Sequence, residues 1–147
     1  MKLDVAFAPQ ALGAADAAGR TVFVIDVLRA TTTICAALAA GARAVIPAAS
    51  GEEAVRLAQS LGGDILLGGE RNCVRMAGFT LGNSPLEMTQ AAVSGKVIVH
   101  STTNGTRALL AVPQARAVYA AAATSCSAAS GTASPWRASR SATVRSR

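Results

Sequence analysis

The stretch Val24-Ile25-Asp26-Val27-Leu28-Arg29-Ala30-Thr31-Thr32-Thr33-Ile34-Cys35 decides which fold and which site this chain can form. Residues 22–28 are almost wholly apolar, as in a strand covered on both faces, and residues 34–40 are rich in helix-forming Ala and Leu. The polar residues therefore fall in a strand-to-helix turn, where α/β sheets bind ligands and helix N–H groups favour anions. An acid beside an arginine here indicates metal-assisted chemistry on a phosphorylated or acidic small molecule. The alternative is a helix capped by Thr31 beside a surface ion pair.

Strands and helices alternate outward from this stretch. We expect strands at residues 2–7, 22–28, 44–48, 64–67, 96–100 and 115–120, and helices at residues 31–40, 50–61, 84–95 and 104–111. Ser50 and Glu53 form a capping box at the start of the second helix, and residues 68–82 look like a long polar loop. The alternation predicts an α/β fold with three α/β/α layers and a largely parallel or mixed sheet.

The sequence also repeats itself weakly at an offset of 73 residues. Val24-Ile25 falls on Val97-Ile98, Thr33 on Thr106, and residues 43–45 on residues 116–118. A duplicated βαβ unit would explain this, and so would chance similarity in a chain with 34 alanines. If the duplication is real, the turns at residues 26–33 and 100–106 are equivalent and face one pocket.

Composition separates a body from a tail. Residues 1–124 carry ten basic and eight acidic side chains and form one expected α/β domain, whereas residues 125–147 contain four arginines, seven serines and no acid. We expect residues 125–147 to be a disordered basic tail, with a frameshifted or misassigned end as its origin and a basic arm for RNA or anionic membrane as the alternative. Because the body has a charge of only +2, we expect no nucleic-acid partner.

Cysteine spacing and hydropathy set the expected compartment. Cys35, Cys73 and Cys126 have no CxxC spacing and are odd in number, which favours a reduced cytoplasmic protein without a zinc site. No signal peptide or membrane span is expected, so no membrane partner is expected either. Homo-oligomers are compatible with this composition. Cys35 is interpreted as a small core residue, with a nucleophile at a helix N-terminus as the alternative.

Two further turns carry acids, hydroxyls or arginines beside predicted strands. Residues 68–72 place Glu70 and Arg71 after two glycines, with a solvated loop and a surface ion pair as the alternative. Residues 100–107 offer four hydroxyls, an amide, a glycine and an arginine, which suit a phosphate or carboxylate cradle. His100 is interpreted as ending a strand, with general acid as the alternative. Neither a Walker A motif nor GxGxxG occurs, so a nucleotide fold is not indicated.

Four motifs together resemble the 2-phosphosulfolactate phosphatase family: IDVLRATTT (residues 25–33), LGGER (67–71), GF with LGNSP (78–79 and 81–85) and STTNGTR (101–107). The LGNSP segment on its own is also explained by helix capping. The resemblance covers roughly residues 3–124. It implies a Mg²⁺-dependent phosphatase of α/β/α architecture that removes phosphate from 2-phospho-3-sulfolactate in coenzyme M biosynthesis, or from a related 2-phosphorylated hydroxy acid.

This resemblance and the turn chemistry give a predicted site for a small anionic phosphorylated substrate. Asp26 and Glu70 are the predicted Mg²⁺ ligands, and Asp26 and Arg29 the predicted catalytic residues. Asp26 as a nucleophile that forms an aspartyl-phosphate is the alternative. The predicted substrate-binding residues are Arg29, Thr31, Thr32, Arg71, Asn83, Ser84, Thr102, Thr103, Asn104, Gly105, Thr106 and Arg107.

The family pattern also includes a longer C-terminal portion with further strands and helices and an acidic Glu-Asp motif before Ala-Gly. No such motif follows Thr124 in this sequence. The alternative function is therefore an inactive truncated fragment that retains only an anion-binding α/β scaffold.

Overall fold

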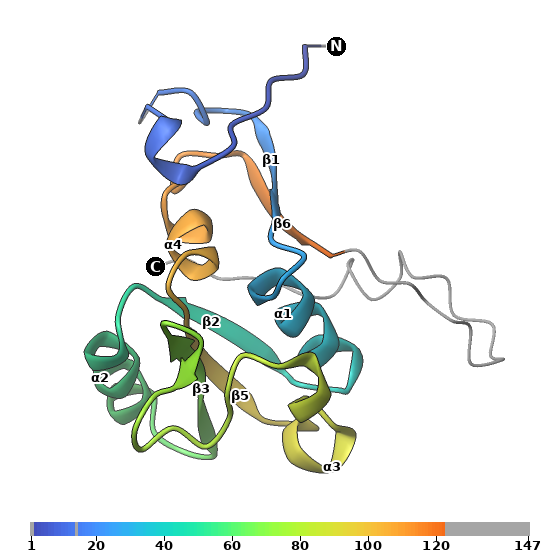
Figure 1. Ribbon diagram of the computed structural model, residues 1–147, viewed down its shortest axis with the longest axis vertical. Coiled ribbons are helices and arrows are strands. Elements are labelled where there is room, and N and C mark those ends of the chain that lie inside the picture. The colour runs from blue at the N-terminus through green and yellow to red at the C-terminus, as the bar shows by residue number, and fades with distance from the viewer. Residues whose placement is uncertain (1, 14, 123–147) are drawn as a thin grey trace, which may run out of the picture.

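Strands and helices alternate along the computed structural model, which describes residues 2–13 and 15–122 (Figure 1). The strands are β1 Thr21–Ile25, β2 Ala44–Ala48, β3 Ile65–Arg71, β4 Val74–Arg75, β5 Val97–Ser101 and β6 Ala117–Ala121. The helices are α1 Ala30–Ala39, α2 Gly51–Leu61, α3 Gln90–Val93 and α4 Gly105–Leu110, and 3₁₀ turns span η1 Pro9–Ala11 and η2 Pro85–Glu87. The predicted α/β class is confirmed.

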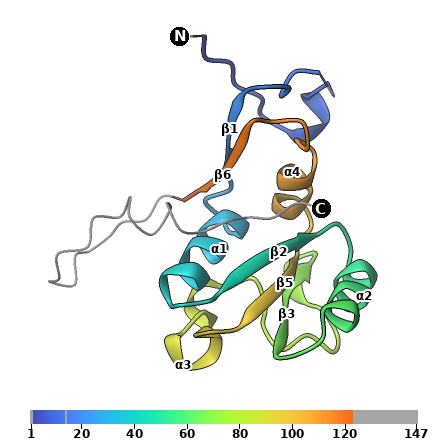
Figure 2. The same cartoon turned by 180° about the vertical axis from the view of Figure 1, so that it is seen from behind.

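The described strands form two sheets. One has the order β2-β5-β3-β4, in which β2, β5 and β3 are parallel and β4 is antiparallel, and the other is the parallel pair β1-β6. Helices α1 and α4 lie between the two sheets, and α2 covers the opposite face of the four-stranded sheet (Figures 1 and 2). The four-stranded sheet is therefore the middle of three α/β/α layers.

The core follows the period of two along the parallel strands. Val45, Ile98 and Leu66 share one register across β2, β5 and β3 and pack toward α1 and α4. Their neighbours one position later, headed by the fully buried Val99, pack on the opposite face against α2. Because β5 is covered on both faces, all five of its residues are buried, as the apolar run predicted.

Strand pairing has the pattern of a duplicated βαβ unit. The first strand of each unit pairs with the last strand of the other, since β1 lies beside β6 and β5 beside β2. Thr21 pairs with Ala117, and Val97, 76 residues after Thr21, pairs with Ala44, 73 residues before Ala117. The two pairings thus share one register when the units are exchanged, which supports duplication over chance similarity.

The predicted loop at residues 68–82 is wrong at its start. Strand β3 continues through Gly68 and Gly69 beside β5 and ends at Arg71. A Cβ on Gly69, whose φ is 143°, would collide with the carbonyl of Ser101, so only glycine lets the strands approach here. The glycines that favoured a loop are in fact needed by the strand.

Three other expectations need correction. Residues 2–7 form no strand, because among the described residues no neighbouring strand pairs with them. The predicted helix at 84–95 breaks into η2 and α3, since Thr89 caps a new helix by accepting a hydrogen bond from Ala92 N at 3.3 Å. Arg29, not Thr31, occupies the N-cap position of α1. The predicted tail, with Cys126, lies outside the described residues.

The capping box at α2 is confirmed in its first half. Ser50 Oγ accepts a hydrogen bond from Glu53 N at 3.1 Å. The Glu53 carboxylate accepts from Ala49 N at 2.7 Å, one residue before the position that a full capping box uses. Gly41, with φ 92°, follows the C-cap of α1 as predicted.

Candidate active site

The turn after β1 and the turn after β5 touch each other. A Cβ on Gly105, the first residue of α4, would collide with Ala30 Cβ and lie 2.6 Å from Asp26 Oδ2. Gly105 is buried and Asp26 is half-buried. The absence of a side chain at Gly105 therefore brings the Asp26 carboxylate against the start of α4, and the two predicted turns face one region.

Glu70 joins the same region from the end of β3. Its Oε1 accepts a hydrogen bond from Thr103 N at 2.7 Å, and its Oε2 accepts from Thr103 Oγ1 at 3.0 Å and from Cys73 N at 2.8 Å. Burial by itself would raise the pKa of Glu70, but the hydrogen bonds from Thr103 and Cys73, with the charge of Arg71, hold that pKa below its ordinary value. Glu70 is thus a buried carboxylate that stays charged.

Three of the predicted substrate-binding hydroxyls are buried and bonded within the chain. Thr31 Oγ1 accepts from Asp26 N at 2.8 Å and lies 2.7 Å from the Ala121 carbonyl, its acceptor at the end of β6. Thr102 and Thr106 bond each other: Thr106 N donates to Thr102 Oγ1 at 3.0 Å, and Thr102 N donates to Thr106 Oγ1 at 2.9 Å. These hydroxyls shape the two turns, and their contact with a substrate stays a prediction.

Of the remaining hydroxyls and amides, Thr32 Oγ1 donates to the Val27 carbonyl at 2.9 Å. Asn104 is exposed at the N-cap position of α4, and its side chain caps no backbone N–H. Ser84 is half-buried at the N-cap of η2 without a side-chain cap bond. Asn104 therefore offers a free polar group beside the touching turns.

The three predicted anion-binding arginines differ in their surroundings. Arg71 is half-buried and donates to the Thr102 carbonyl and to Ser101 Oγ, both at 3.4 Å. Arg29 is half-buried at the start of α1, and Arg107 is exposed in α4. None of the ion pairs between described residues includes these arginines, so the alternative readings as surface pairs with Asp26 or Glu70 are wrong.

Asn83 reaches the site through His100. Asn83 Oδ1 lies 3.2 Å from His100 Nε2, and both side chains are buried. Burial lowers the pKa of His100 to about 4, against a smaller opposing effect of the Glu70 charge. His100 is therefore neutral near pH 7, which favours the interpretation as a buried end of β5 over that of a general acid.

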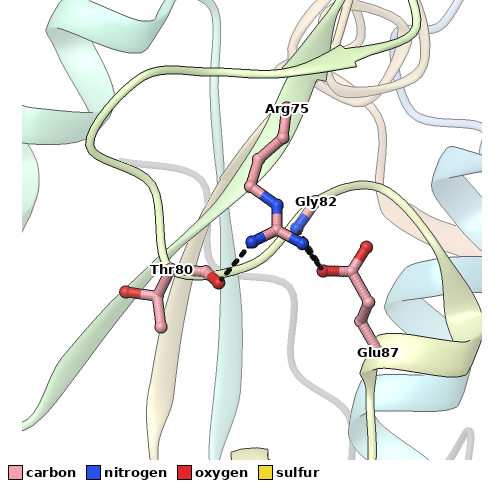
Figure 3. Close-up of polar contacts among 4 residues, drawn as sticks. All are labelled: Arg75, Thr80, Gly82 and Glu87. Carbon is pink, nitrogen blue, oxygen red and sulfur yellow. Dashed lines mark hydrogen bonds and ion pairs between the residues drawn. The ribbon is translucent and has the colours of Figure 1, made fainter.

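The loop that carries Asn83 and Ser84 is held by a carboxylate (Figure 3). Glu87 Oε2 accepts from Gly82 N at 2.9 Å and pairs with Arg75 Nη2 at 2.9 Å, while Arg75 Nη1 donates to the Thr80 carbonyl at 3.4 Å. These contacts tie β4 to η2 across the loop. They form no contact with Asp26 or Thr103, so the structure connects this segment to the rest of the site only through His100.

Sequence reasoning missed several partners of the predicted residues. Ser101 Oγ, Cys73 N and Asn72 N bond Arg71, Glu70 and Thr103 respectively. Asn72 and Cys73 have φ values of 52° and 64°. The one available signal was Asn72, because asparagine tolerates positive φ better than most residues. Cys35 is half-buried and burial raises the pKa of its thiol, which fits a packing role better than a nucleophile.

Asp26 suits a magnesium ion better than Glu70 does. No hydrogen bond or ion pair from a described residue reaches the Asp26 carboxylate, whereas both oxygens of Glu70 accept hydrogen bonds. Over residues 2–13 and 15–122, no three His, Cys, Asp or Glu side chains gather into a metal cluster. Mg²⁺ needs no such cluster, since it keeps several waters and takes one or two carboxylates together with substrate phosphate.

Comparison with known proteins agrees with the motifs. The family model described as 2-phosphosulpholactate phosphatase matches residues 6–137. The chain belongs to the 2-phosphosulfolactate phosphatase family. A relative from Symbiobacterium thermophilum, named probable 2-phosphosulfolactate phosphatase, is 53% identical over 109 residues, which are 74% of this chain and 47% of the relative.

Two more relatives with the same name extend this comparison. The one from Carboxydothermus hydrogenoformans is 48% identical over 82% of this chain and 48% of its own length. The one from Clostridium perfringens is 47% identical over 74% of this chain and 45% of its own length. This member of the family thus spans about half the length of the curated relatives it matches. None of its described helices is long and apolar enough to cross a membrane.

Proposed function

We propose that this chain carries the substrate-binding part of a magnesium-dependent phosphatase that hydrolyses 2-phospho-3-sulfolactate, or a related 2-phosphorylated hydroxy acid, to the free hydroxy acid and phosphate. Membership of the 2-phosphosulfolactate phosphatase family supports the reaction class. The observation that carries the proposal for this chain is the contact between the Asp26 carboxylate and Gly105, at the meeting of two strand-to-helix turns. A role in coenzyme M biosynthesis in the cytoplasm belongs to the same proposal.

The substrate would be held mainly by charge. It carries a phosphate, a carboxylate and a sulfonate, and guanidinium groups bind such oxyanions through paired N–H donors. Arg29 and Arg107 have no acidic partner among the described residues, so their donors are free for these groups. Asn104 adds an exposed amide at the start of α4.

In the hydrolysis, a water oxygen forms a bond to phosphorus, the ester P–O bond breaks, and the 2-hydroxyl leaves with a proton. Asp26 would hold the magnesium ion, which offsets phosphoryl charge when bound. Asp26 is also the one candidate nucleophile, because its carboxylate accepts no hydrogen bond from the described residues. Trapping with a phosphate mimic and searching for a modified Asp26 separates these two roles. No observation favours the alternative of an inactive scaffold.

The test replaces Asp26 and measures phosphate release. We expect that Asp26→Asn lowers Mg²⁺-dependent turnover at least about a thousandfold, because the substitution removes the charge from the central carboxylate. The assay uses the 147-residue chain, with the equivalent substitution in the Symbiobacterium thermophilum relative in parallel. Asp64→Asn is the matched control, since Asp64 is exposed and contacts only Lys96, at 3.9 Å. Activity retained in the Asp26 variant would refute the assignment.

A further inference from the structure

Glu70 holds two loops rather than facing an open space. Its carboxylate is 7% exposed and accepts hydrogen bonds from both the backbone and the hydroxyl of Thr103, and from the backbone of Cys73. Carboxylates that accept N–H bonds form stronger hydrogen bonds than neutral acceptors do. A neutral side chain of the same shape could not accept all three, because one of its terminal atoms would be a donor.

The turn after β3 presents its N–H groups to the same place. Asn72 and Cys73 both have positive φ, as in the type I′ turns that close two-residue hairpins. Asn72 N donates to Thr103 Oγ1 at 3.2 Å, while Cys73 N donates to Glu70. The hairpin of β3 and β4 and the segment after β5 are thus joined at Thr103 by four hydrogen bonds that share Glu70 or the Thr103 hydroxyl.

The same segment continues to the Asp26 carboxylate. Thr103 is followed by Asn104 and Gly105, and the bonds between Thr102 and Thr106 on either side fix the backbone between them. Gly105 is the residue that lies against Asp26 and Ala30. An unbroken series of contacts therefore leads from Glu70 through Thr103 to Asp26.

We propose that Glu70 is a positioning residue, which fixes residues 102–107 beside Asp26 by bonding Thr103 and the β3–β4 turn, and that it is not a magnesium ligand. This inference rests on the proposed function for its consequence in catalysis. Its structural content, the hold on Thr103, stands apart from any activity.

The first test measures amide hydrogen exchange by NMR on the full 147-residue chain. We expect Glu70→Gln to speed exchange of the Thr103 and Cys73 amides roughly tenfold to a hundredfold, since one strong acceptor is lost. Glu53→Gln is the matched control, because Glu53 also accepts a backbone N–H, that of Ala49, at the start of α2. It should speed exchange of Ala49 alone. Unchanged exchange at Thr103 in the Glu70 variant would overturn the proposal.

A milder variant covers the case in which Glu70→Gln does not fold. Thr103→Ala removes the hydroxyl bonds to Glu70 and Asn72 and keeps the backbone bond to Glu70. It should speed exchange of the Asn72 amide at least about fivefold and leave Cys73 protected. Exchange at Asn72 that stays at the wild-type rate would contradict the proposed joint.

The second test separates positioning from metal binding by steady-state kinetics. If Glu70 acts through Thr103, Glu70→Gln and Thr103→Ala each lower kcat about tenfold or more, and the double variant is no slower than the slower single variant. The Mg²⁺ concentration for half-maximal activity should change less than twofold. A tenfold higher Mg²⁺ requirement with kcat restored at saturation would make Glu70 a ligand and overturn the proposal. A wild-type chain without activity would refute the proposed function, and the exchange measurements would still decide the hold on Thr103.

Discussion

At the scale of single residues, most polar groups in this region serve to hold backbone. Thr102, Thr106 and Glu70 are all buried, and each forms hydrogen bonds with a turn or a helix start. Among the described residues, Thr33 Oγ1 is the one buried side-chain polar atom without a partner. Because buried polar groups are costly unless bonded, the carboxylate of Asp26, half-buried and without a hydrogen bond, differs from its neighbours. That contrast singles it out for chemistry.

The buried His100 makes stability depend on pH. The folded chain does not protonate His100 until about pH 4, whereas the unfolded chain takes up the proton near 6.5. The unfolded state therefore binds more protons between these values, and the free energy of unfolding falls as pH is lowered through them. We expect a loss of roughly 2 to 3 kcal/mol between pH 7 and 4.5, measured by urea unfolding at both pH values.

His100→Gln supplies the comparison for this slope. Glutamine has an amide that can donate to Asn83 Oδ1, but it does not titrate. The variant should be less stable at pH 7 and should lose little further stability down to pH 4.5. Glu70 does not account for the same range, since its lowered pKa affects stability only below its ordinary value of 4.5. Equal slopes in the two proteins would show that His100 is not the group responsible.

At the scale of elements, the site depends on two helices that begin close together. Helices α1 and α4 start at Ala30 and Gly105, and these two residues touch. Gly105 is buried and has an ordinary negative φ, so glycine is required there for space and not for backbone conformation. Any side chain at this position would separate the two helix starts.

Gly105→Ala should therefore destabilise the chain although alanine favours helices. The added Cβ would collide with Ala30 and press on Asp26, at an expected cost of about 1 to 3 kcal/mol in unfolding free energy, with loss of activity. Gly51→Ala is a matched control, since Gly51 is also the first residue of a helix and its Cβ would meet only the flexible end of Met76, at 3.0 Å. That variant should be neutral or slightly stabilised. Equal melting temperatures for the two variants would contradict the close approach.

The helices and parallel strands could be predicted because their signals are local. Ser50 with Glu53 marked the start of α2, and the apolar run before Asp26 marked β1. The end of β3 could not be predicted, because Gly69 is in the strand for its contact with Ser101, a residue 32 positions away. For the same reason the turns were located correctly, while the internal bonds of Glu70, Thr102 and Thr106 were not foreseen.

At the scale of the whole molecule, the pair β1-β6 differs from the central sheet. Its inner side chains, Val24 among them, pack against the helices between the sheets, as the layers in Figure 2 show. On its outer side, Phe23, Ile25 and Tyr119 are 56%, 69% and 43% exposed. The apolar character of β1 on both sides had predicted a strand covered on both faces, and in the described residues only one face is covered.

This open face should bind hydrophobic dyes. The rings of Phe23 and Tyr119 stack with centroids 5.3 Å apart and form a contiguous apolar surface, whereas single exposed apolar residues are ordinary. We expect the double variant Phe23→Thr, Tyr119→Thr to lower ANS fluorescence and light scattering severalfold, at a cost of about 1 kcal/mol for the lost ring contact. Threonine keeps the preference for β structure, and Leu86→Thr, at an exposed position on η2, is the control. Dye binding that falls equally in the control would mean that exposed apolar residues act singly and not as one face.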